Sequence, residues 1–510
     1  MTRRTLISLL MSVVGVAIAV VALMGVMRSG EGMVRSTQDV AGIPVTLLQP
    51  EGVGSQRPAV VMLHGFAASS VIMEPLAHTL VRAGYVVALP DQRGHGNSTS
   101  SLGSTTDREN LQADLATVVG WLAMQPDVDA DRLGLVGHSM GAGAVTEYAM
   151  TQPPGVQGTV AISLPDAIDS GTRPRNLQLL FGANEPARFL DAAGEQLRLI
   201  EPSAEVGPVY GDVALGTGLQ AQQIPVVEHI TIVWSDSTAT AMLTWLGVAL
   251  DVEGPFDAQV DPAWLWLLLL LGAAGIVVIP FASVLYGRGN RRRLEATVRG
   301  WHALALTAVG ALGASVVLAV VPDDWTEVVP VAVGGYLAAW FALLATVIAG
   351  SLRLLPTYVR RDFQPAPGRD LWASIAFALL VTLVLVGATR LTWAAAAFVG
   401  PRWWVTIVLA AVLVAYFYAD AVLISRPGML RRIGVLVGNR VIVAGALIAA
   451  VSLLGAPGIL TLLVPVIALL FAVLGYFATV ATMHTPLRIA PALVQGLPLA
   501  AIIGSGFPLQ

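Results

Sequence analysis

Long apolar runs with almost no charged side chains fill the second half of this 510-residue chain and limit what it can fold into. A helix rises ~1.5 Å per residue, so a run of about 20 residues crosses the ~30 Å hydrocarbon core of a bilayer. Residues 489–508 are apolar but interrupted by Pro and Gly, which is typical of a re-entrant or interfacial piece as much as of a span. We predict about seven membrane-spanning helices, at residues 263–286, 301–321, 331–352, 371–388, 403–425, 441–454 and 459–483.

Another apolar region lies at the N-terminus. After Arg3 and Arg4, residues 5–27 carry no charge and are long enough to span a bilayer as one helix. The Ala-Ile-Ala triplet at 17–19 resembles a signal-peptide cleavage site, but the apolar run continues beyond it. This continuation favours an uncleaved anchor, residues 1–29, over a cleaved signal peptide.

Residues 30–262 differ from the apolar runs in charge and in pattern. They hold 26 acidic residues and 10 arginines, whereas residues 263–510 hold 7 acidic residues and 16 arginines. Short apolar stretches alternate with longer amphipathic ones, which is typical of strand–helix units on a parallel sheet. We therefore predict an α/β domain with a doubly wound, mostly parallel sheet at 30–257 and an all-α transmembrane helix bundle at 258–510. The predicted strands are 59–63, 85–89, 133–136, 159–163, 177–181 and 223–227, and the predicted last helix is 236–248.

Cysteine and lysine are both missing from the chain. Their absence excludes disulfides, thiolate metal sites, a Cys nucleophile, a Lys Schiff base and a Walker-type phosphate lysine. The net charge of −4 gives no reason to expect a nucleic-acid partner.

One short motif carries recognisable chemistry. Gly137-His138-Ser139-Met140-Gly141 follows the predicted strand 133–136 and precedes a helical stretch, 142–150. A serine hydroxyl is a poor nucleophile unless a tight turn exposes it beside a base and backbone donors. Glycines two residues before and after the serine allow such a turn, so Ser139 is predicted to be a nucleophile on a strand–turn–helix elbow.

At these residues the sequence resembles the α/β-hydrolase superfamily, over about residues 45–250. The segment 126–139 is similar to the run that leads into the family's nucleophile, and Asp91–Ser98 resembles the family's D-x-R-G-x-G-x-S turn. Leu63-His64-Gly65-Phe66 resembles the family's oxyanion turn, which implies an oxyanion hole formed by the backbone amides of Phe66 and Met140.

The resemblance also implies the other members of a catalytic triad. The family order is serine, acid, histidine, and His229 is the histidine that follows Ser139 within the α/β domain. Glu185 lies at the offset where the family places its acid, with Asp166 as the alternative and Asp191 a distant third. His64, His95 and His138 adjoin the motif turns and are interpreted as supporting residues.

These residues predict a membrane-anchored serine hydrolase that cleaves a carboxylic ester or related acyl bond and needs no metal or organic cofactor. The expected partners are a small-molecule or lipid acyl substrate and the lipid bilayer. Two other hypotheses stay open. The chain could be a transporter or envelope scaffold whose α/β domain binds or senses a ligand, or an envelope acyltransferase that uses the same triad.

The arginines predict how the spans are oriented, because positively charged loops stay in the cytoplasm. With the N-terminus inside, the inside segments hold 16 arginines, and the outside loops hold Arg390 and Arg402. Most of the 16 lie in 288–299, 353–369 and 426–440. The hydrolase-like domain is then extracytoplasmic.

Asp420 falls late in a predicted span, where burying an acid is costly. It is either a functional residue of the membrane part or a residue near the cytoplasmic end that pairs with Arg426 or Arg431.

Overall fold

In the computed structural model, the described part of the chain forms two compact units. The sheet unit comprises residues 22–268, 389–399 and 506–510, and the helical unit comprises residues 1–21, 269–388 and 400–505. The predicted domain limits of 1–29, 30–257 and 258–510 stay predictions. The described residues are 3–52, 56–103, 108–254, 256, 258–287, 300–322, 324–354, 368–393, 398–424, 429–462 and 464–510.

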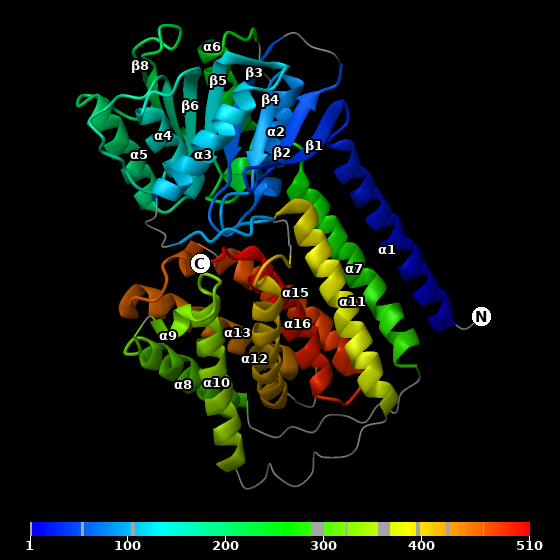
Figure 1. Ribbon diagram of the computed structural model, residues 1–510. Coiled ribbons are helices and arrows are strands. Elements are labelled where there is room, and N and C mark those ends of the chain that lie inside the picture. The colour runs from blue at the N-terminus through cyan, green and yellow to red at the C-terminus, as the bar shows by residue number, and fades with distance from the viewer. Residues whose placement is uncertain are drawn as a thin grey trace. The chain divides into compact units, whose positions relative to one another are not determined.

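The sheet unit is built on one mixed sheet whose strands lie in the order β1-β2-β4-β3-β5-β6-β7-β9-β8 (Figure 1). The inner strands run parallel, and β1, β2 and β8 pair antiparallel with their neighbours. The predicted mostly parallel sheet is therefore confirmed. Its strands are β1 Met33–Val40, β2 Ile43–Pro50, β3 Arg57–Leu63, β4 Val86–Pro90, β5 Val128–His138, β6 Val156–Ile162, β7 Leu177–Gly182, β8 Val209–Tyr210 and β9 Leu219–Ile224.

Helices cover both faces of this sheet, because the inner strands are apolar on both faces. Along β3, Val60 and Met62 pack in the core under α2 and α6, whereas Val61 and Leu63 pack in the core under α3 and α4. Successive residues of a strand point to opposite faces, so an unbroken apolar run is what a doubly covered strand requires. The helices of this unit are α2 Ser70–Arg82, α3 Arg108–Ala123, α4 Met140–Met150, α5 Ala187–Ile200, α6 Asp236–Ala249 and the one-turn 3₁₀ helix η1 Thr231–Trp234.

One predicted strand is displaced. The sequence 223–227 was expected to be a strand because it is apolar, but β9 is Leu219–Ile224 and the chain turns at Val226, whose φ is 65°. Near the sheet edge, β9 alternates buried Leu219 and Ala221 with less buried glutamines. A half-covered strand has this period-2 pattern, which an apolar-run criterion misses.

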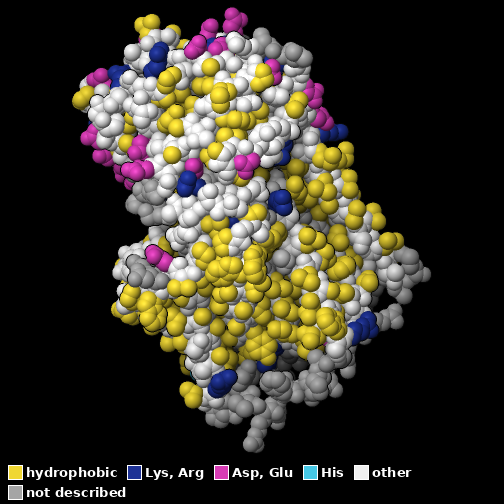
Figure 2. Space-filling model, viewed as in Figure 1, with side chains coloured by type: hydrophobic (Ala, Val, Ile, Leu, Met, Phe, Trp, Pro, Cys, Tyr) yellow, Lys and Arg dark blue, Asp and Glu magenta, His cyan; other side chains and the backbone are white. Residues whose placement is uncertain are grey.

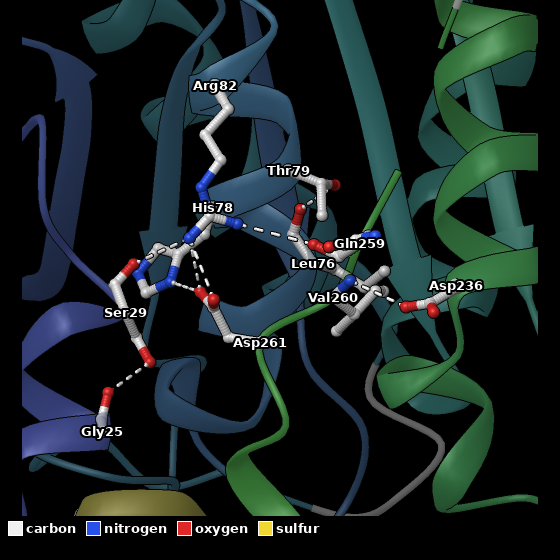
Figure 3. Close-up of polar contacts among 10 residues, drawn as sticks. All are labelled: Gly25, Ser29, Leu76, His78, Thr79, Arg82, Asp236, Gln259, Val260 and Asp261. Carbon is white, nitrogen blue, oxygen red and sulfur yellow. Dashed lines mark hydrogen bonds and ion pairs between the residues drawn. The ribbon is translucent and has the colours of Figure 1, made fainter. Parts of the chain in front are cut away.

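A polar cluster in the sheet unit joins the residues after α1, helix α2 and the segment before α7 (Figure 3). Arg82 donates from one terminal nitrogen to both carboxylate oxygens of Asp261, at 2.9 Å each, and to the Ser29 carbonyl oxygen at 3.1 Å. His78 lies 2.7 Å from the same carboxylate. The cluster therefore joins the first and last parts of segment 22–268 within the sheet unit.

The helical unit is strongly apolar, and yellow hydrophobic side chains dominate its visible face in Figure 2. Within the described residues, nine helices are long and apolar enough to cross a membrane, counting the N-terminal one. Long apolar helices of this number suggest a multi-pass membrane protein. The helices are α1 Arg3–Arg28, α7 Ala263–Leu285, α8 Gly300–Leu318, α10 Gly334–Leu354, α11 Gly368–Thr392, α12 Arg402–Ile424, α13 Met429–Leu454, α15 Val464–His484 and α16 Ile489–Gly506, with the single turns α9 Asp324–Glu327 and α14 Ile459–Leu462.

Two of these helices differ from the sequence interpretation. Helix α16 is continuous through Pro498, so the apolar segment at 489–508 has the length of a span. Helix α13 begins at Met429, twelve residues before the predicted span at 441–454, and the polar Asn439 and Arg440 in its first half are buried.

The early start of α13 changes the interpretation of Asp420. Its partner is Arg440, whose terminal nitrogen lies 2.6 Å from the carboxylate. Of the two expected partners, Arg426 and the side chain of Arg431 lie outside the described part of the chain, as do the arginines of 288–299. Arg440 was counted as a loop residue, but it is 8% exposed inside the helical unit.

Candidate active site

Ser139 lies on a sharp turn between β5 and α4. Its backbone angles are φ 54° and ψ −115°, and such conformations cost non-glycine residues ~1–3 kcal/mol. A Cβ on Gly137 would overlap the Gly141 carbonyl, and a Cβ on Gly141 would lie 2.7 Å from the carbonyl oxygens of Leu63 and His64. Both glycines are therefore required by close backbone approach, and the turn exposes the serine at the carboxyl end of the parallel strands.

The structure brings Ser139, His229 and Glu185 together in a continuous chain of polar contacts. The Nε2 atom of His229 lies 3.1 Å from the Ser139 hydroxyl oxygen. On the other side of the ring, Nδ1 lies 2.6 Å from a carboxylate oxygen of Glu185. With Nδ1–H donating to Glu185, Nε2 is left to accept the serine proton, as a general base must.

Glu185 is held in place from its own turn. Its second carboxylate oxygen accepts a hydrogen bond of 2.6 Å from the Gly182 amide at the end of β7, and its side chain is 1% exposed. Asp166, the alternative acid, follows β6 and is exposed. The Nδ1 position that it would need is taken by Glu185, so the geometry favours Glu185 as the acid.

The two expected oxyanion donors flank the serine. Met140 follows Ser139 directly and begins α4. Phe66 follows Gly65, where a Cβ would lie 3.1 Å from the Ser139 Cβ and 3.0 Å from the His138 ring. The turn after β3 is thus packed against the elbow, and glycine at 65 permits this approach. The role of the Phe66 and Met140 amides stays a prediction.

His138 supports the base through the backbone. It is buried, and its Nε2–H donates a hydrogen bond of 2.8 Å to the His229 carbonyl oxygen. Burial, and secondarily the neighbouring His229, lower the pKa of His138 from 6.5 to about 3. His138 is therefore neutral at physiological pH and acts as a fixed donor that positions the loop carrying His229.

The remaining motif residues brace the turns around the site. His64 is fully buried, donates from Nδ1 to the Gly65 carbonyl at 2.8 Å, and accepts from the Gln92 amide at 3.1 Å. Burial lowers the pKa of His64, which is thus also neutral. Asp91 accepts from the Ser70 and Asn97 amides at 2.9 Å each and so links its own turn to α2. These contacts agree with the supporting role expected for the motif.

Sequence reasoning missed Phe189, which lies in α5. Its ring stacks on the His229 imidazole, with centroids 4.4 Å apart and planes inclined by 26°, and the side chain is fully buried. The residue fixes the plane of the imidazole between Ser139 and Glu185. In the sequence, a Phe in an amphipathic helix just after the proposed acid cannot be told apart from an ordinary core residue.

Trp393 was missed as well, since it follows α11 far along the chain and was assigned to the membrane part. In the sheet unit its indole nitrogen lies 3.4 Å from the Ala67 carbonyl oxygen, next to the expected oxyanion donor Phe66. Its ring meets Trp234 edge to face at a centroid distance of 6.0 Å, and Trp234 ends the 3₁₀ helix that follows His229. One aromatic side chain therefore connects the two loops that hold the oxyanion turn and the base.

The last residues of the chain contact a third loop of the site. Leu509 is buried, and its amide and carbonyl bond to Gly94 and Leu102, at 2.8 Å each. Gly94 has φ 78°, and a Cβ there would lie 2.7 Å from the Leu509 carbonyl oxygen. The D-x-R-G turn thus carries a backbone bridge that its motif does not reveal.

A family model described as "Serine aminopeptidase, S33" matches residues 54–181, which contain the oxyanion turn and the Ser139 elbow. The sheet unit belongs to the α/β-hydrolase superfamily. The matched residues are about a quarter of the chain and lie within the first segment of the sheet unit.

Among curated proteins, the hydrolase domain is similar to the "Thermostable monoacylglycerol lipase" of Bacillus sp. (strain H-257), with 32% identity over 139 residues. That match covers 27% of this chain and 51% of the relative, so the chain spans about half the length of the curated relative. An uncharacterized 31.7 kDa protein of Escherichia coli is 31% identical over 109 residues, which are 21% of this chain and 37% of that protein.

Solved structures that resemble the hydrolase domain include a dienelactone hydrolase from Anabaena variabilis and an S-formylglutathione hydrolase from Agrobacterium tumefaciens. The first is 19% identical with a TM-score of 0.33 and covers 43% of this chain and 97% of its own. The second is 15% identical with a TM-score of 0.34 and covers 43% of this chain and 96% of its own.

Proposed function

We propose that the chain is a membrane-anchored serine hydrolase that cleaves a carboxylic ester or related acyl bond through an acyl-enzyme on Ser139. The observation that carries the proposal is the contact chain from the Ser139 hydroxyl through His229 to the buried carboxylate of Glu185. The strained backbone at Ser139 supports it, because strain of this kind persists where function requires an exposed nucleophile.

The first half-reaction forms the acyl-enzyme. The Ser139 oxygen attacks the carbonyl carbon of the ester while His229 Nε2 takes the hydroxyl proton, and Glu185 stabilises the imidazolium that results. The Phe66 and Met140 amides donate to the oxygen that becomes negatively charged. When the tetrahedral intermediate collapses, the ester C–O bond breaks and His229 returns the proton to the leaving alcohol.

The second half-reaction uses water as the nucleophile. His229 takes a proton from water, the hydroxide attacks the acyl carbon, and the acyl–Ser139 bond breaks as the serine regains its proton. The products are the free acid and regenerated enzyme. Water supplies the proton that Ser139 regains, and side chains and backbone amides of this chain supply the base and the hydrogen-bond donors in both steps, so we expect no cofactor requirement.

We infer an amphiphilic acyl ester as the substrate class. One curated relative is named a monoacylglycerol lipase. In addition, two tryptophans, Trp234 and Trp393, lie next to the loops of the proposed site. Aromatic rings combine a large apolar surface with a polar atom, which suits a substrate with an acyl chain and a polar head.

We further propose that the hydrolase domain is extracytoplasmic, as the arginine distribution indicates. Fusions of a reporter after residue 255 and after residue 295 test the orientation, with an extracytoplasmic signal expected from the first and a cytoplasmic signal from the second. A cytoplasmic signal from the first fusion would reverse the assignment.

Labelling with a fluorophosphonate probe tests the chemistry. Detergent-solubilised wild type should gain the mass of one phosphonyl group on the peptide that contains Ser139, and folded Ser139→Ala should gain none. His229→Ala should label at least tenfold more slowly. Equal labelling of Ser139→Ala and wild type would refute the proposed nucleophile.

A further inference from the structure

The helical unit contains a buried polar network that the proposed hydrolysis does not use. Arg440, on α13, bonds to Asp420 at 2.6 Å, to the Gln495 amide oxygen at 3.0 Å and to the Tyr416 hydroxyl at 3.1 Å. The second carboxylate oxygen of Asp420 accepts from Asn439 at 2.9 Å. Both oxygens of this carboxylate are therefore engaged, and its charge neutralises Arg440.

A pocket of about 40 Å³ adjoins this network between α12, α13, α15 and α16. Gln495 belongs both to the network and to the pocket wall. One water needs about 10–15 Å³ by the same measure, so the space suits a group the size of a few waters. Two guanidinium groups line it, Arg432 and Arg488, together with Thr479, Thr482 and apolar side chains such as Leu436.

Both charged side chains that line this pocket are arginines. Arg432 donates to the Thr482 hydroxyl at 2.8 Å, and its Nε is buried without a hydrogen-bond partner in the described part of the chain. The single negative charge of Asp420 is already balanced by Arg440, its ion-pair partner at 2.6 Å. Helices α13 and α16 also begin beside the pocket, at Met429 and Ile489, and helix N-termini favour anions.

We propose that this pocket binds the phosphate group of an anionic lipid. Guanidinium groups bind phosphate oxygens through paired, charge-assisted hydrogen bonds. The mainly apolar wall suits the acyl part of a lipid more than a free ion. The pocket lies where α12 and α15 end and α13 and α16 begin, which is the side that the arginines assign to the cytoplasm, and basic pockets between helices on that side recognise anionic headgroups.

The test uses the full chain, purified in a mild detergent, and native mass spectrometry with added lipid. Wild type should retain phosphatidylglycerol at least fivefold more than phosphatidylcholine. The double variant Arg432→Gln/Arg488→Gln should lose this preference. Arg353→Gln, which removes an exposed arginine at the end of α10, is the matched control and should keep it. Labelling of Ser139 by the fluorophosphonate probe reports that each variant is folded and separates this result from the hydrolase chemistry.

Equal retention of the two lipids by wild type, or an unchanged preference in the double variant, would overturn the proposal. Added inorganic phosphate distinguishes a site for a lipid headgroup from a site for a free phosphate ion. If millimolar phosphate stabilises wild type thermally while phosphatidylglycerol is not retained, the pocket is a site for a free anion and the lipid assignment is wrong. The wild-type comparison needs no variant, so equal retention of the two lipids would refute the proposal even if the double variant does not fold.

Discussion

The His138 ring donates a hydrogen bond of 2.8 Å to the backbone carbonyl of His229, so the residue before the proposed nucleophile holds the loop of the proposed base. Burial lowers the pKa of His138 to about 3, so a neutral imidazole makes this contact at physiological pH. The geometry of the active site thus depends on a residue that does no chemistry itself.

Acid should destabilise the hydrolase domain through His138. Its folded-state pKa lies below the ordinary 6.5, so the unfolded chain binds the proton more readily between pH 6.5 and about 3. Stability contributed by the neutral form is thus present above pH 6.5 and is lost as the pH falls, by an amount on the order of 4 kcal/mol at pH 3. The melting temperature of His138→Gln, measured from pH 7 to pH 4, should fall less steeply than that of wild type. His302→Gln serves as control, and parallel slopes for His138→Gln and wild type would contradict the account.

Glu185→Gln should lower kcat by roughly 10²- to 10⁴-fold, because an amide no longer stabilises the imidazolium or fixes its tautomer. Asp166→Asn removes a charge of the same sign from an exposed position, and the kcat of this variant should stay within about twofold of that of wild type. Steady-state hydrolysis of a soluble ester checks both variants. The opposite ranking would make Asp166 the acid.

The backbone at Ser139 should be strained, and replacing this serine by glycine should relieve the strain. Ser139→Gly should unfold at a higher denaturant concentration than Ser139→Ala, with a difference of ~1 kcal/mol, because glycine tolerates a φ of 54°. Gly137→Ala should prevent correct folding, since its Cβ has no room. Gly143→Ala, also next to the elbow but facing open space, is the control and should be neutral or slightly stabilising. Equal stability of the two Ser139 variants would argue against strain.

Trp393→Ala should reduce kcat/KM for long-chain esters more than for acetate esters, because the residue borders the loops of Ala67 and Trp234. We expect a loss of about tenfold for long chains and less than threefold for acetates. Trp393→Phe, which keeps the ring and loses the indole donor, separates packing from hydrogen bonding. Trp372→Ala, whose side chain is 71% exposed, is the control. Uniform losses with both chain lengths would assign Trp393 a purely structural role.

Local sequence was enough for much of the site. The Ser139 elbow requires glycines at fixed offsets, and the inner strands must be apolar on both faces, so both features appear as short patterns. Likewise, Glu185 and His229 follow from a family order, and the structure brings them to Ser139. Such features depend on neighbours within a few residues or on a shared topology.

Features that depend on distant packing were not predictable. Arg440 looked like a loop arginine until Asp420, Tyr416 and Gln495 satisfied it inside the helical unit. Trp393 fell inside the predicted membrane part, and nothing near it in sequence points to Ala67. Polar side chains that pair across tens or hundreds of residues produce no local periodicity or motif in the sequence.

Hydrolysis of an acyl-ester series by wild type and Ser139→Ala tests the central claim most directly. With p-nitrophenyl esters from acetate to palmitate, and equal amounts of folded protein in detergent, wild type should release p-nitrophenol with saturation kinetics. Ser139→Ala should be at least 10³-fold slower on every ester that wild type cleaves. Turnover by Ser139→Ala within tenfold of wild type would contradict the proposed acyl-enzyme, as would wild-type turnover no faster than the uncatalysed rate across the series.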